Sequence, residues 1–152
     1  MNMLYAKLIS MNCLNFDFAE CSFSEKMMNV KDKRDGLSRE GSGRVGVFKA
    51  TGITHSYTLE CNYASGKRIN YIPPKLIKAT GQIEPESYIT DPKSKMYTNT
   101  GIRSPYYSVD IFEDVGRASC VALLDYIDKN PISRIPMSAA KTLENLKNEI
   151  CT

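Results

Sequence analysis

The sequence predicts an α/β fold in one domain, because helical and strand-like patterns both occur in a chain of ordinary globular composition. The chain has 152 residues, of which 42% are hydrophobic and 24% are charged. This length and composition are sufficient for one hydrophobic core and argue against an intrinsically disordered chain. Apolar residues recur at helical spacing near both ends of the chain, and they alternate with polar residues over residues 53–61.

Charge, hydropathy and cysteine spacing exclude several classes of protein. The chain carries 20 Lys and Arg against 17 Asp and Glu, and this balance is not typical of a nucleic-acid-binding protein. No apolar run reaches the ~18 residues that a membrane span requires, and no signal-peptide pattern opens the chain. The five cysteines are widely and irregularly spaced, which indicates reduced thiols. We therefore expect a cytoplasmic protein that binds neither nucleic acid nor membrane.

The N-terminal segment predicts a helix followed by a strand. Leu4, Leu8 and Met11 lie at helical spacing over residues 3–11, and residues 14–18 alternate between apolar and polar side chains. The helical pattern starts at the beginning of the chain without a cap or lead-in. We therefore expect the chain to begin inside a larger domain.

A polar, basic loop over residues 19–43 precedes two further predicted strands. Residues 44–50 have a β-rich composition, and Thr51-Gly52 is typical of a turn. In residues 53–61 the side chains alternate, and the polar face carries Thr54, Ser56, Thr58 and Glu60. This pattern predicts a half-buried strand that ends near Glu60.

The second half of the sequence predicts a long loop and two helices. Residues 62–105 contain five of the seven prolines and are expected to form a long loop, in which residues 73–104 are a loop insertion. Residues 108–129 predict a helix, and Asn130-Pro131 ends it. Its apolar stripe is expected to consist of Val109, Phe112, Val115, Ala118 or Ser119, and Ala122 or Leu123. Residues 138–150 predict a short terminal helix.

The carboxylate of Glu60 is the first candidate for chemistry. Ligands bind at the carboxyl ends of strands in open α/β sheets, and a carboxylate there can act as a general acid or base. The pattern alone also fits a solvated residue at the end of a strand. The choice between these interpretations therefore depends on the surrounding residues.

Several segments of the chain resemble the cytosolic carboxypeptidases, and the stretch from Glu40 to Tyr63 is the most diagnostic. The resemblance covers nearly the whole chain apart from residues 73–104 and is carried by NFDF (15–18), FSEK (23–26), DGLSREGSGRV (35–45), HSYTLECNY (55–63) and YYSVDIFEDVGRA (106–118), from which it continues to residue 136. These proteins are zinc metallocarboxypeptidases that remove glutamates from protein C-termini, notably of tubulin. The branch with the greatest resemblance removes branch-point glutamates.

The resemblance implies a fold and two site residues. Residues 1–152 would form the C-terminal half of the catalytic domain, a carboxypeptidase-A-like mixed sheet with helices on both faces. The family's catalytic glutamate falls on Glu60, which would take a proton from zinc-bound water and deliver it to the leaving amine. Arg44 would line the substrate pocket and pair bidentately with a glutamate side chain. An arginine that only begins a strand is the alternative interpretation of Arg44.

The zinc ligands of the family, an H-x-x-E pair and a distant histidine, lie upstream of the matched region. We therefore expect this chain to contribute no metal ligand. His55 is interpreted as a packed or hydrogen-bonded strand histidine. The predicted function is that of a metallocarboxypeptidase fragment. When joined to its zinc-binding half, it would hydrolyse C-terminal or branch-point glutamates from glutamate-rich protein C-termini such as those of tubulin. The alternative is a non-catalytic remnant or a binding module for acidic protein tails.

Overall fold

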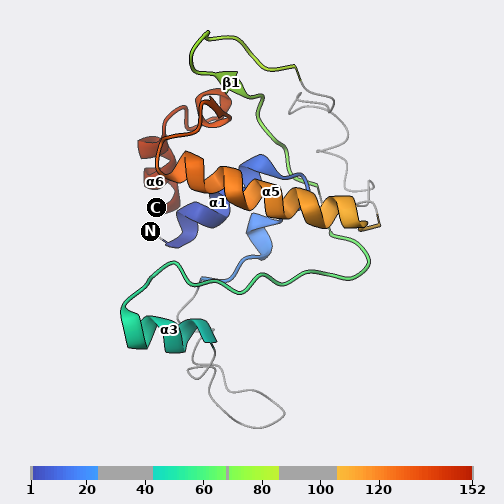
Figure 1. Ribbon diagram of the computed structural model, residues 1–152, viewed down its shortest axis with the longest axis vertical. Helices are drawn as coiled ribbons and strands as arrows, with labels where there is room; N and C mark the ends of the chain where they lie inside the picture. Colours follow the sequence, from blue (N-terminus) through green and yellow to red (C-terminus); the bar gives the residue numbers. More distant parts are fainter. Residues whose placement is uncertain (1, 24–42, 68, 86–105, 152) are drawn as a thin grey trace.

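The computed structural model describes residues 2–23, 43–67, 69–85 and 106–151. The described residues form α1 (Asn2–Asn12), the 3-10 helix η1 (Phe18–Glu20), α3 (Gly43–Thr51), β1 (Leu76–Ile77), α5 (Val109–Tyr126), β2 (Ile132–Ser133), the 3-10 helix η3 (Ile135–Met137) and α6 (Leu143–Cys151). Figure 1 shows α1, α5 and α6 gathered together, whereas α3 lies apart from them. None of the described helices is both long and apolar enough to cross a membrane.

The hydrophobic core lies between α1, α5 and α6. From α1 it receives Leu4, Leu8 and Met11, which are buried on one face as the sequence predicts. From α5 it receives Ala118 and Ala122, whose small side chains allow the two helices to approach closely. We call the three helices and η3 the packed cluster.

The long helix α5 was predicted at residues 108–129 and is confirmed, with somewhat narrower bounds. Ser108 is the N-cap of α5. Beyond the C-terminal end of the helix, Asp128 has a left-handed backbone conformation with φ 53°. Its apolar stripe was predicted wrongly at the N-terminal end, because Val109 and Phe112 are exposed. The later part of the predicted stripe is confirmed at Ala118 and Ala122, which are buried together with Asp125.

A buried carboxylate joins two helices of the packed cluster to β2. The Oδ2 of Asp125 accepts a hydrogen bond from Asn12 Nδ2 at 2.9 Å, and its Oδ1 accepts from Asn130 Nδ2 at 2.9 Å and Ser133 Oγ at 2.7 Å. A buried charge is tolerated when donors of this kind replace its hydration. These bonds hold α1, the end of α5 and β2 together.

The sheet in the described residues is small. β1 and β2 are antiparallel, with Leu76 opposite Ser133 and Ile77 opposite Ile132. The fold is thus mainly helical with one short sheet, which is compatible with the broad α/β class. A carboxypeptidase-A-like mixed sheet with helices on both faces is not confirmed by the described part of the chain.

Three predicted strands are wrong. Residues 14–15 form a turn, and Phe18 is the first residue of η1, whose N-cap Asp17 accepts from the Ala19 backbone N–H with its side chain. Residues 44–50 lie in α3, where local helical hydrogen bonds satisfy the backbone in place of strand pairing. Residues 53–61 form no strand, since a strand requires a hydrogen-bonded neighbour.

Residues with a left-handed backbone conformation set the end of α3 and the start of α6. Gly52, at φ 72°, ends α3 with its N–H bonded to the Phe48 carbonyl, and this left-handed conformation favours glycine. The terminal helix was predicted from residue 138 but starts at Leu143, because Lys141 has φ 65°. The polar loop over residues 24–42 and residues 86–104 of the predicted insertion lie outside the described residues.

Candidate functional site

Both predicted site residues lie in residues 43–63, which we call the arm. It consists of α3 and an extended segment that runs below the packed cluster in Figure 1. Most of the arm is exposed, including apolar side chains such as Phe48 and Leu59, and Val45 is the buried residue of α3. The arm therefore presents its side chains at the surface.

The arm brings Arg44 next to the segment that carries Glu60. Arg44 lies in the first turn of α3, and its Nη1 donates to Thr58 Oγ1 at 2.9 Å. Thr58 is two residues before Glu60, and side chains at this spacing lie on the same side of an extended chain about 7 Å apart. Glu60 is exposed and lies in a segment without regular structure, so its predicted place at the end of a strand is wrong.

The single histidine connects the arm to the packed cluster. His55 Nδ1 lies 2.8 Å from the Tyr57 hydroxyl, and His55 Nε2 lies 3.2 Å from the Tyr126 hydroxyl. The Tyr57 hydroxyl donates to the Asn2 carbonyl at 2.7 Å, so it accepts from His55 Nδ1–H. In the neutral imidazole this leaves Nε2 as the acceptor for the Tyr126 hydroxyl. The prediction that His55 is hydrogen-bonded is confirmed, whereas its place on a strand is wrong.

Two tyrosines around His55 were missed by the sequence analysis. Burial, with the nearby Tyr126 and Tyr5 hydroxyls, raises the pKa of Tyr57 to about 12, so its hydroxyl keeps its proton at neutral pH. The spacing of Tyr57 two residues from His55 was a usable signal, since both lie on one face of the alternating pattern. Tyr126 is 71 residues from His55, and no local pattern relates the two.

The described residues do not fit a zinc site. Zinc in proteins is held by three or four His, Cys, Asp or Glu side chains, and no group of three such residues occurs in the part of the chain that the structure describes. Both ring nitrogens of His55 already face tyrosine hydroxyls. Burial raises the pKa of the Cys13 thiol to about 12, which disfavours the thiolate that binds metal.

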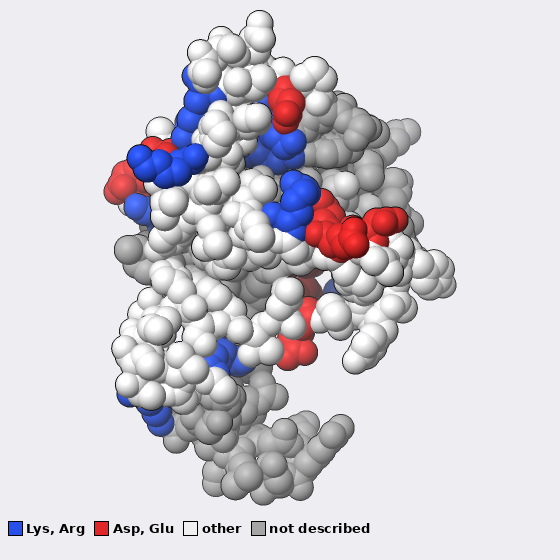
Figure 2. All heavy atoms as spheres, in the orientation of Figure 1, with Lys and Arg blue, Asp and Glu red and all other residues white. Residues whose placement is uncertain are grey.

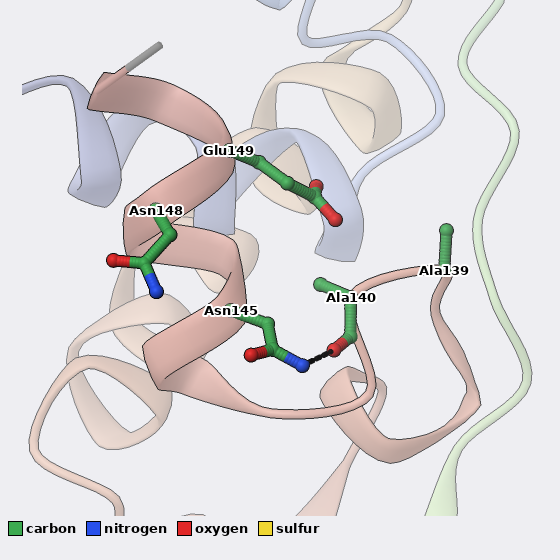
Figure 3. Close-up of a pocket in the computed structure, with 5 residues that line it drawn as sticks. All are labelled: Ala139, Ala140, Asn145, Asn148 and Glu149. Carbon is green, nitrogen blue, oxygen red and sulfur yellow. Dashed lines mark hydrogen bonds between the residues drawn. The ribbon is translucent and has the colours of Figure 1, made fainter.

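A shallow hollow of about 400 Å³ lies between α6 and the loop before it. Figure 3 shows its lining residues, which are Ala139, Ala140, Asn145, Asn148 and Glu149. The Asn145 side chain donates to the Ala140 carbonyl at 2.9 Å, which fixes the loop against the helix. Neither Arg44 nor Glu60 lines this hollow, so it is separate from the predicted site.

Comparisons with known proteins give a consistent result. No family model matches the chain. The protein named cytosolic carboxypeptidase-like protein 5 from Danio rerio is 47% identical over 149 residues, which cover 98% of this chain and 15% of that protein. The proteins of the same name from Rattus norvegicus and Homo sapiens are each 47% identical over 146 residues, or 96% of the chain, and the match covers 16% and 15% of their lengths. The chain thus spans only a small part of the relatives that it matches.

Proposed function

We propose that the chain belongs to the cytosolic carboxypeptidase family and is part of a carboxypeptidase catalytic domain. The observation that carries this proposal is the 47% identity over 98% of the chain to a protein with that name. We propose further that the substrates are C-terminal or branch-point glutamates of proteins such as tubulin. The word cytosolic in the relatives' name supports the cytoplasmic location expected from the sequence.

In this proposal Glu60 and Arg44 have separate roles. Glu60 acts as the general base, taking a proton from the attacking water and passing it to the leaving amine. Arg44 binds the side-chain carboxylate of the terminal glutamate, because a guanidinium presents two parallel N–H donors to a carboxylate. The bond from Arg44 to Thr58 supports this assignment, since it holds the guanidinium beside the segment that carries Glu60.

We propose that the zinc ligands of such an enzyme come from outside this chain, as the family resemblance implies. The described donor groups do not form a zinc site, and the sequence contains one histidine. We therefore expect activity only when the chain is joined to the remaining part of the catalytic domain.

The test is a chimera in which this chain replaces the matching 149-residue segment of the Danio rerio relative. We expect the chimera to release glutamate from a peptide with a C-terminal glutamate. Glu60→Gln keeps the shape of the side chain but removes the proton acceptor, and it should lower kcat by roughly 10²–10⁴-fold. Glu144→Gln, at an exposed position in the first turn of α6, is the matched control and should retain full activity.

Two outcomes contradict the proposal. A folded Glu60→Gln chimera with more than a tenth of the parent kcat would show that Glu60 is not the base. A folded parent chimera that binds glutamate-rich peptides without cleaving them would instead favour the binding-module alternative.

The role of Arg44 makes a separate prediction in the same assay. Hydrogen bonds to charged groups contribute about 1.5–3 kcal/mol, so Arg44→Ala should lower kcat/KM for glutamate-terminated peptides by about 10- to 150-fold. Peptides with a neutral C-terminal residue should be affected far less, and Arg44→Lys should recover part of the loss. Equal losses on both peptide classes would remove Arg44 from the substrate pocket.

A further inference from the structure

The long helix α5 is apolar on two opposite sides. Its inner side, with Ala118 and Ala122, is buried against α1. At 100° per residue, a second set of side chains falls on the opposite side of the helix. We call this set the outer face of α5. Its apolar members are Val109, Phe112, Cys120, Leu123 and the adjoining Ile127, and the exposed Glu113 lies at its edge beside Cys120. The four large apolar members are between 41% and 69% exposed.

An exposed apolar face is unusual for a helix at the surface of a complete globular domain. Such helices carry charged or polar residues on the outside, whereas a helix that is apolar on both sides is typical of a buried position between two layers. In Figure 2 part of the surface over α5 is uncharged, whereas basic and acidic side chains gather over the end of the helix toward the right of the view. Near that end, Arg117 pairs with Asp114 at 2.5 Å, to the side of the outer face.

We propose that the outer face of α5 is an interface with the polypeptide that forms the remaining part of a cytosolic carboxypeptidase-like protein. The identity of this partner rests on the proposed function. The length of the relative supports this partner, because the segment that matches this chain is only 15% of the Danio rerio protein. In that relative, most of the polypeptide is available to cover the face. A second copy of this chain is the competing occupant.

The first experiment measures binding of the 152-residue chain to the Danio rerio relative from which the matching segment has been deleted. We expect a one-to-one complex that Leu123→Glu weakens at least about tenfold, since a charge is then buried at the interface. Ile83→Glu is the matched control, because Ile83 is 53% exposed but lies outside α5, and it should bind like the parent chain. Leu123 is itself 54% exposed, so the thermal unfolding of the free chain should hardly change.

Three results would overturn the inference. These are equal binding by Leu123→Glu and the parent chain, no complex with a folded partner, and a homodimer that Leu123→Glu dissociates without any binding to the relative. The last result would assign the outer face to a second copy.

A second measurement does not require the deleted relative to fold alone. Cys120 carries an exposed thiol on the outer face of α5, so its rate of alkylation shows whether another polypeptide covers this face. We expect alkylation of Cys120, followed by peptide mass spectrometry, to be at least about tenfold slower in the chimera than in the free chain. Equal rates in a folded chimera would overturn the inference.

The two proposals can fail separately. A chimera with a protected Cys120 but no glutamate release would contradict only the proposed function. An active chimera in which Cys120 reacts as fast as in the free chain would contradict only the interface.

Discussion

The packed cluster and the arm have equally regular sequence patterns but very different surroundings. Leu8 in the cluster is 0% exposed, whereas Leu59 in the arm is 63% exposed. In both regions the spacing of apolar residues predicts which side chains share a face. The difference in exposure between Leu8 and Leu59 shows that the spacing of apolar residues does not specify whether other parts of the protein bury the face that they share. The predicted chemistry lies in the region with less cover.

The hydrogen bonds of the two regions also differ in burial: those of the cluster are buried, and those of the arm are exposed. In the cluster, Asp125 accepts three hydrogen bonds at a buried position. In the arm, the bond from Arg44 to Thr58 and the contacts of His55 lie at the surface. Buried hydrogen bonds to a charged group contribute more to stability than exposed ones, because water competes for the latter. The arm should therefore open locally at a lower free energy than the cluster.

A pair of leucine substitutions gives the largest expected contrast between the regions. Leu8→Ala leaves a cavity in the core and should lower the free energy of unfolding by about 2–5 kcal/mol. Leu59→Ala makes the same chemical change at an exposed position and should change it by less than about 0.5 kcal/mol. Urea unfolding followed by circular dichroism measures both. Similar losses would show that the arm is packed as tightly as the cluster.

A smaller contrast is expected from the pH dependence of stability. Burial raises the pKa of Cys13 from 9.0 to about 12 in the folded chain. Above pH 9 the unfolded state therefore loses the thiol proton while the folded state keeps it, and stability falls as pH rises from 9 toward 12. Between pH 8 and pH 10 this thiol should account for a loss of about 1 kcal/mol in the free energy of unfolding.

The control for this prediction uses one cysteine from each region. Cys13→Ala should remove that part of the decline, whereas Cys61→Ala, at an exposed position in the arm, should leave it in place. Urea unfolding at a series of pH values measures each slope. A Cys13→Ala variant with the same slope as the parent chain would rule out the buried thiol as its source.

The sequence predicted the helices of the cluster because their signals are local. The spacing of Leu4, Leu8 and Met11 corresponds to contacts within one helix face, and α1 is confirmed. Strands were harder to predict, because the alternation of apolar and polar residues over 53–61 does not indicate whether another strand lies beside them to form hydrogen bonds. In residues 44–50, helical bonding prevailed over a β-rich composition.

The candidate site was predictable to a different extent. Arg44 and Glu60 were assigned from a resemblance, and their roles stay predictions. The bond from Arg44 to Thr58 joins α3 to the later segment and had no sequence signal. The contact of His55 with Tyr126 depends on how α5 packs, so it required the fold.

Hydrogen exchange of the backbone amides in residues 53–61 tests most directly whether the arm pairs with the remaining polypeptide of a cytosolic carboxypeptidase-like protein. In the free chain these residues form no strand, so their amides should exchange with little protection. In the chimera with the Danio rerio relative, a neighbouring strand should slow their exchange by at least roughly 100-fold. Exchange at the same rate in the free chain and in a folded, active chimera would contradict this view of the arm.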